Sequence, residues 1–275
     1  RLDAPNRTAA QLNAAQLHLT HGSEHRIEGS GWIRSRTLLN HGVISSVPDG
    51  LSRLWVEGDI TQGMGGMIVS DGQQVVFRGD TAITGGTLDS MNGGSFKSEA
   101  ASRGLRGTGI QGNLDLELGF RGEFMFAGTI THHGEITTTL SASGGDLLIA
   151  VVEDTLLTGE SRFRFQCAFS GHVGEGCEIV VTNNSVFTLD RDVVLEGRGL
   201  VRITEGSTLM NLGRIEANLP GEALVIEGHL SGPGELVANN AMIAIDGVCE
   251  GQQISVFGSP DLLRVSNALL RDVRF

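Results

Sequence analysis

One passage of this 275-residue chain occurs twice. The stretch from Ile27 to Ile60 and the stretch from Leu195 to Leu230 are identical at thirteen positions, with gaps only where turns are expected. Such long-range repetition is typical of solenoids, in which each unit stacks on the next and buries a shared core. The matched pairs are Glu28/Glu196, Gly29/Gly197, Gly31/Gly199, Arg34/Arg202, Thr37/Thr208, Leu38/Leu209, Asn40/Asn211, Gly42/Gly213, Ile44/Ile215, Gly50/Gly221, Leu54/Leu224, Glu57/Glu227 and Gly58/Gly228.

A shorter unit recurs through the rest of the chain and consists of an apolar residue, a charged residue and glycine. We interpret it as the end of a strand: the apolar side chain points into the core, the charged one points to solvent, and glycine turns the chain. The default reading of the charges is a solvated face, although stacked acids could also pair with arginine or bind cations. The unit ends at Gly29, Gly58, Gly79, Gly107, Gly122, Gly197 and Gly228.

Helical patterns are scarce in this sequence. Only residues 7–17 are compatible with a helix, and they suit a first strand equally well. Forty of the 275 residues are glycine, about twice the usual share of ~7%. Short alternating strands are expected between these glycines throughout the chain. Asp-Gly pairs at 49–50, 71–72 and 246–247 leave a hairpin-built sandwich open. The irregular spacing of the turns and the duplication favour an all-β, single-stranded parallel β-helix with about 11–13 rungs.

This coil is expected to form one elongated domain over residues 1–275. Residues 1–25 are expected to be an N-terminal cap or the first rung. Residues 255–275 are expected to be the last rung or an assembly segment, because the stretch from Leu262 to Leu270 is apolar and the open edge of a last rung needs a cap or a partner.

The pattern Leu-x-Asn-x-Gly-x-Ile occurs at Leu38–Ile44 and again at Leu209–Ile215. It resembles the repeats of right-handed β-helical surface proteins of bacteria, which include autotransporter passenger domains and haemagglutinin-type adhesins. The resemblance implies a right-handed coil and a secreted or cell-surface protein with a structural or adhesive, non-enzymatic role. The sequence departs from that group because no export signal and no membrane barrel are visible in it.

The two copies place an asparagine and a glycine at equivalent positions, Asn40 and Gly42 in one and Asn211 and Gly213 in the other. A buried asparagine at a turn can bond to its neighbours on adjacent rungs and satisfy backbone groups there. We therefore interpret these residues as structural parts of a ladder, together with Gly29, Gly58, Gly197 and Gly228.

Charge limits the partners that this protein can have. Thirty-two acids and 20 bases give a formal net charge of −12, which disfavours binding to nucleic acid. No apolar run approaches the ~20 residues of a transmembrane helix. The expected partners are other copies of the chain, stacked end to end into a fibre or oligomer, or a surface glycan or protein.

The three cysteines leave at least one thiol unpaired. Cys167 and Cys177 flank a glycine-containing segment that could fold back to allow a disulfide, and two reduced thiols are the alternative. Cys249 lies in an apolar alternating stretch and is expected in the core.

No motif identifies a catalytic residue, a cofactor or a metal site. His132-His133-Gly134-Glu135 is the nearest approach to a metal cluster, but neighbouring side chains of an extended segment point to opposite sides. We expect a solvated loop there. A polysaccharide-degrading lyase or hydrolase, or a phage-tailspike-like domain, with a carboxylate groove is the alternative function. Its candidate acids are Asp115 and Glu117, Glu153 and Asp154, and Asp190 and Asp192.

Overall fold

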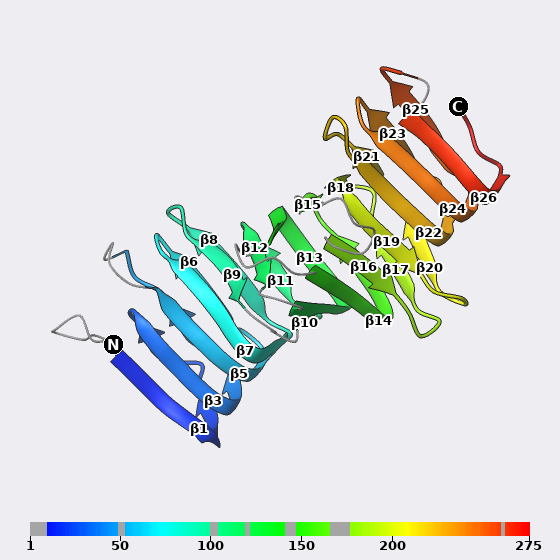
Figure 1. Ribbon diagram of the computed structural model, residues 1–275. Coiled ribbons are helices and arrows are strands. Elements are labelled where there is room, and N and C mark those ends of the chain that lie inside the picture. The colour runs from blue at the N-terminus through cyan, green and yellow to red at the C-terminus, as the bar shows by residue number, and fades with distance from the viewer. Residues whose placement is uncertain are drawn as a thin grey trace.

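The computed structural model describes residues 10–48, 53–99, 104–118, 122–140, 147–165, 177–259 and 262–275. These residues contain 26 β-strands and no α-helix, and all the strands join one continuous, parallel-paired sheet. The sheet winds into a β-solenoid of about ten turns. Figure 1 shows the turns stacked along one axis, with the two termini at opposite ends of the molecule. The expected all-β parallel β-helix is confirmed.

Each turn of the coil has three strand segments, which stack on equivalent segments above and below to form three walls. Wall A contains Gly31–Arg34 and its partners Leu54–Glu57. Wall B contains Thr37–Asn40, which pairs with Asp59–Gln62. Wall C contains Val43–Ser45, which pairs with Met67–Val69.

The strands are short in most turns, and a few bend across two or three walls. The N-terminal ones are β1 (Ala10–His21), β2 (Arg26–Glu28), β3 (Gly31–Asn40), β4 (Val43–Ser45), β5 (Leu54–Gln62), β6 (Met67–Asp71), β7 (Gln74–Thr84), β8 (Thr87–Met91) and β9 (Ser95–Glu99). The central ones are β10 (Gly104–Arg106), β11 (Gly109–Gln111), β12 (Leu114–Leu118), β13 (Gly122–Leu140), β14 (Leu147–Thr158), β15 (Ser161–Phe165), β16 (Cys177–Val181) and β17 (Val186–Leu189). The C-terminal ones are β18 (Val193–Gly197), β19 (Gly199–Ile203), β20 (Thr208–Asn211), β21 (Arg214–Ala217), β22 (Ala223–Ser231), β23 (Glu235–Asn239), β24 (Met242–Glu250), β25 (Gln253–Phe257) and β26 (Leu263–Arg271).

The core is a set of inward-pointing apolar side chains that stack from turn to turn. Strand alternation sends every second side chain inward, and parallel pairing places it directly above its equivalent on the preceding turn. On wall A this stack consists of residues exposed to solvent by 3% or less, namely Leu54, Val75, Phe96, Leu114, Ile136, Phe163, Leu195, Ile215, Leu236 and Ile254.

The number of turns is slightly below the expected 11–13, because the turns differ in length. Stacked neighbours are 22 residues apart at Asn40 and Gln62 but 32 residues apart at Arg164 and Glu196. Within the segment that could have been a helix, residues 10–17 belong to strand β1, which supplies part of the first rung. At the other end, β25 and β26 form the last rung.

The two copies of the duplicated passage are rotated by one wall relative to each other. Residues 31–34 of the first copy lie on wall A, whereas the equivalent residues 199–202 belong to β19, which continues wall B through β16, β14 and β13. Glycines with positive φ show the same rotation by one wall. Gly58 and Gly79 lie between walls A and B, whereas Gly228 and Gly247 lie between walls B and C. The change lies between β7, which bends from wall A to wall B, and β13, which bends from wall B to wall C; between them, β9 on wall A and β10 on wall B are separate strands.

Candidate functional site

The asparagine of the first copy lies inside a corner of the coil. Asn40 is fully buried, and it stacks between His21 and Gln62 on the adjacent turns. Its Oδ1 accepts hydrogen bonds from His21 Nδ1 at 2.7 Å and from the Gly42 N–H at 3.2 Å. Its Nδ2 donates to Gln62 Oε1 at 3.4 Å and to the Met67 carbonyl at 3.2 Å. The side chain thus satisfies polar groups on three turns, which is a structural task.

The second copy repeats this corner with different neighbours. Asn211 is fully buried, and its Nδ2 donates to Gln252 Oε1 at 2.8 Å and to the Glu235 carbonyl at 3.3 Å. Glycine follows two residues later in both copies because the backbone of the preceding turn comes very close. A Cβ would lie 2.4 Å from a carbonyl oxygen at Gly42 and 2.3 Å from one at Gly213.

In the recurring three-residue unit, glycine is required by the backbone angle as well as by close packing. Gly58 and Gly228 have φ angles of +129° and +107°, which side-chain-bearing residues rarely adopt. A Cβ would also lie 1.9 Å from the Ser35 carbonyl oxygen at Gly58 and 2.1 Å from the Ile203 carbonyl oxygen at Gly228. Gly29 and Gly197 also have positive φ. All of these positions shape the coil.

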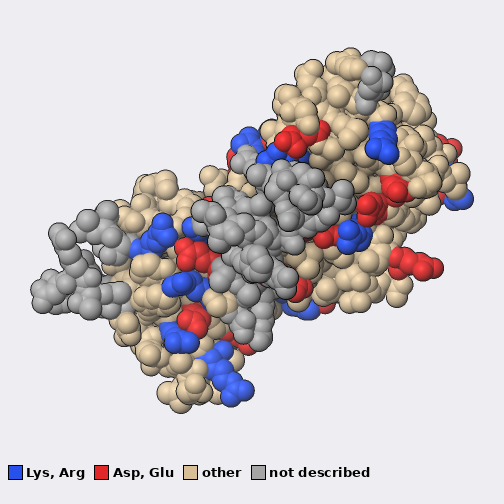
Figure 2. Space-filling model, in the orientation of Figure 1, with Lys and Arg blue, Asp and Glu red and all other residues tan. Residues whose placement is uncertain are grey.

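The charges on the N-terminal turns of wall A alternate in sign from turn to turn. Arg34 is the register partner of Glu57, and Glu57 is the partner of Arg78. The Arg34 Nη2–Glu57 Oε1 distance is 3.0 Å, and the Arg78 Nε–Glu99 Oε2 distance is 3.4 Å. Figure 2 shows basic and acidic side chains next to each other on this half of the molecule. Pairing with arginine therefore relieves the repulsion expected from stacked acids.

Glu196 departs from the expected solvated face, because only 6% of its side chain is exposed. Arg162 and Arg164 contact its carboxylate at 2.9 and 2.7 Å, and the Asn218 amide donates to it at 3.3 Å. Glu216, its register partner on the next turn, is also nearly buried and contacts Arg214 at 2.9 Å. Donors hold both carboxylates and solvent barely reaches them, so neither is placed to act on an external substrate.

The acid pairs considered for an enzyme do not form one site. Asp115 and Glu117 belong to β12, whereas Glu153 pairs with Arg106 at 2.7 Å. Asp190 accepts a hydrogen bond from Thr158, and this bond, followed by one from the Arg191 N–H, holds the pKa of Asp190 below its usual value. These contacts use the carboxylates to fasten neighbouring parts of the coil.

The expectation of a solvated loop at His132 is wrong, since residues 122–140 form the single strand β13. His132 occupies the inward position that Ile110 fills on the preceding turn, and it is fully buried. Its Nδ1 lies 2.6 Å from Ser161 Oγ and its Nε2 lies 3.0 Å from the Gly112 carbonyl oxygen. Burial lowers the pKa of His132 to about 4, helped by the nearby His133 and opposed by the bond to Gly112.

The cysteines are in two chemical states. Cys249 is a free thiol within the core, as expected, and Cys177 is disulfide-bonded. Cys167 lies outside the described residues, so the bridge between Cys167 and Cys177 stays a prediction.

A shallow pocket of about 450 Å³ lies on the outer surface where walls B and C meet. It crosses four strands that stack on successive turns of the C-terminal half, namely β20, β22, β24 and β26. Sequence patterns did not indicate it, because its members are scattered over almost 70 residues and only the winding brings them together. The lining residues are Ile203, Thr204, Glu205, Gly206, Ser207, Thr208, Gly228, His229, Val248, Glu250 and Arg271.

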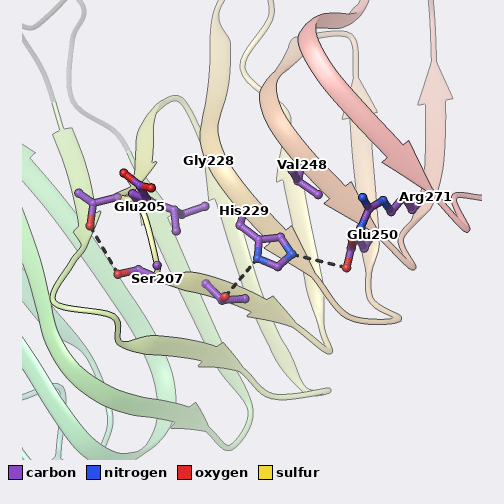
Figure 3. A pocket seen from close by; sticks show the side chains of 11 residues that line it. Glu205, Ser207, Gly228, His229, Val248, Glu250 and Arg271 are labelled. Carbon is purple, nitrogen blue, oxygen red and sulfur yellow. Dashed lines mark hydrogen bonds and ion pairs between the residues drawn. The ribbon is translucent and has the colours of Figure 1, made fainter.

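The polar side chains of this pocket form a connected row. His229 Nδ1 lies 3.3 Å from Thr208 Oγ1, and His229 Nε2 lies 3.5 Å from Glu250 Oε2. Arg271 donates to the other oxygen of Glu250 at 2.9 Å. Figure 3 shows Glu205 on one side of the pocket and Glu250 with Arg271 on the other, with His229 between them. The row offers hydrogen-bond donors and acceptors to a ligand.

No family model, curated protein or solved structure matches this chain. Among the described residues, no three histidine, cysteine, aspartate or glutamate side chains are grouped so as to hold a metal ion. Within the same part of the chain, no helix has the length and hydropathy to span a membrane.

Proposed function

We propose that this protein is a non-enzymatic structural or adhesive β-solenoid whose copies stack end to end. The observation that carries the proposal is the state of the core at the two ends of the coil. The described residues leave eight apolar side chains only partly buried against the core, and all eight belong to the first or last turn: Leu12, Leu19, Ile27, Leu262, Leu263, Ala268, Leu270 and Val273. The described part of the chain therefore covers the stacked core incompletely at both ends.

The end strands also have free edges. Among the described strands, β1 pairs only with β3 and β26 pairs only with β24, whereas β25 is bridged to Arg274. Because all pairing is parallel, the free edge of β26 has the direction needed to receive the β1 edge of another copy. Such head-to-tail contact repeats without closing and generates a filament.

We further propose that the protein acts outside the cell or at the cell surface, presenting its rigid walls to a surface glycan or protein. The Leu-x-Asn-x-Gly-x-Ile resemblance to bacterial adhesins supports this location. The disulfide-bonded Cys177 also supports it, because structural disulfides persist mainly in oxidising compartments.

Light scattering over a range of concentrations, with negative-stain microscopy, tests the stacking. We expect rods joined at their ends, and we expect Leu269→Lys, at a side chain of β26 that is 47% exposed, to shift the assembly toward single rods. Met91→Lys is the matched control, because Met91 is 42% exposed but ends β8, which is paired with β6 on one side and β11 on the other. Single rods of the wild-type chain at every concentration would refute the stacking.

A further inference from the structure

The pocket between walls B and C is elongated along the coil axis. Thr208, His229, Val248 and Leu269 are on successive stacked strands, and Arg271 extends the row on the last of them. Three steps of ~4.8 Å span about 14 Å, which exceeds the width of a single sugar ring. The pocket is open rather than enclosed, so it suits a segment of a longer chain more than a small molecule.

The floor of the pocket is made of backbone and aliphatic carbon. Gly228 has no side chain, and its neighbours in the floor include Ile203 and Val248. This surface suits the C–H groups of a ligand that also carries polar groups at its edges.

The polar side chains are within reach of such a ligand. The exposed fractions are 41% for the His229 side chain, 30% for Glu250 and 60% for Arg271. His229 Nε2 is buried beside Glu250 and His229 Nδ1 contacts Thr208 Oγ1, so His229 offers a ligand the exposed part of its ring rather than a free nitrogen. The exposed charged groups that can bond to a ligand beside His229 are therefore Glu250 and Arg271.

Charge selects among the ligands that could bind there. Arg271 compensates Glu250, which leaves the exposed Glu205 as the one uncompensated carboxylate of the lining. The net charge of −12 repels acidic polymers, and Glu205 and Glu250 lie on opposite sides of the pocket, where they cannot share a cation (Figure 3). Hydroxyl groups, which both donate and accept, match this mixture of groups best.

We propose that the pocket binds a neutral oligosaccharide that lies along the coil axis, with Glu250 and Arg271 hydrogen-bonded to its hydroxyl groups and the ring of His229 against it. Binding requires no second copy of the protein, so the inference is independent of end-to-end stacking. The pocket contains none of the chain's aromatic side chains on which a sugar could stack, so the affinity is expected on the order of 1 mM.

Titration with cellohexaose and mannohexaose, followed by NMR of the histidine ring protons, tests the proposal. His229→Gln assigns the ring resonances of His229, which are expected to shift on saturable binding of at least one neutral hexaose. Glu250→Gln is expected to weaken that binding about tenfold. Glu222→Gln is the control, because Glu222 is also paired with an arginine and is 34% exposed, but lies outside the pocket.

Three results would overturn the proposal. The first is the absence of a His229 shift with either neutral hexaose. The second is equal or tighter, salt-sensitive binding of hexagalacturonate, which would make the pocket an anion site. The third is equal weakening by Glu222→Gln and Glu250→Gln in variants with unchanged circular dichroism.

Discussion

Lowering the pH from 7.5 to 5 is expected to destabilise the coil through His132. In the unfolded chain this histidine titrates near its ordinary value of 6.5, whereas burial lowers its pKa in the folded protein to about 4. Below pH 6.5 the unfolded state therefore binds a proton that the folded state does not. The contribution of His132 to the free energy of unfolding is fully present above pH 6.5 and is lost as the pH falls toward 4.

The size of the effect follows from the two pKa values. Each pH unit between them is worth about 1.4 kcal/mol, so the full loss, reached near pH 4, is about 3 kcal/mol. At pH 5 about 2 kcal/mol of this is lost. The other titrating groups of the protein add their own pH dependence, which a comparison with a variant removes.

Urea unfolding at pH 7.5 and pH 5, applied to the wild-type chain and to His132→Gln, measures this contribution. Between the two pH values the wild-type chain is expected to lose about 2 kcal/mol more than the variant. His25→Gln is the control, because His25 is exposed and lies between β1 and β2, away from His132. Equal losses in wild type and His132→Gln would refute the assignment of a buried, neutral His132.

Three further outcomes are expected. Asn40→Leu removes four hydrogen bonds at a buried corner and should lower the free energy of unfolding by about 2–4 kcal/mol in urea titrations; a loss below about 1 kcal/mol would contradict the ladder role. Gly228→Ala should lower the free energy of unfolding by at least about 2 kcal/mol, because the added Cβ would meet a carbonyl oxygen. Gly93→Ala should lower it by about 1 kcal/mol, because Gly93 also has positive φ but a Cβ there would meet nothing within 4 Å. Equal shifts of the two variants in thermal unfolding would show that crowding is unimportant. Burial, and then the charge of Glu250, raises the pKa of Cys249 to about 11, so iodoacetamide at pH 8 should label it only after unfolding; rapid labelling of the folded protein would show that this part of the core opens.

The fold could be predicted because the features that define a solenoid turn lie within a short stretch of sequence. Short alternating strands, glycines that turn the chain and the repeated Asn-x-Gly corner each act within one turn, and parallel stacking repeats them. The same local logic predicted that Cys249 is buried in the core.

The individual sites were harder to predict, because burial depends on what lies on neighbouring turns. His132 belongs to a pair of histidines next to glycine and glutamate, which suggests a polar loop, yet strand pairing places it above Ile110 in the core. Glu196 and Glu28 share the local pattern Glu-Gly-x-Gly, but only Glu196 is contacted by two arginines. The residues next to a side chain in the sequence do not show which side chains lie on the neighbouring turns.

The sequence by itself determined that this chain forms a repeating parallel coil and where its corners require asparagine or glycine, since those demands arise from backbone geometry within a turn. Only the tertiary structure decided which wall each copy of the duplicated passage occupies, because the wall depends on the number and length of all the segments between the two copies. The same winding decided that Thr208, His229, Glu250 and Arg271 meet in one pocket. Residues about twenty positions apart come within hydrogen-bonding distance only when the length of each intervening turn is right, and loop lengths, not side-chain types, set that length.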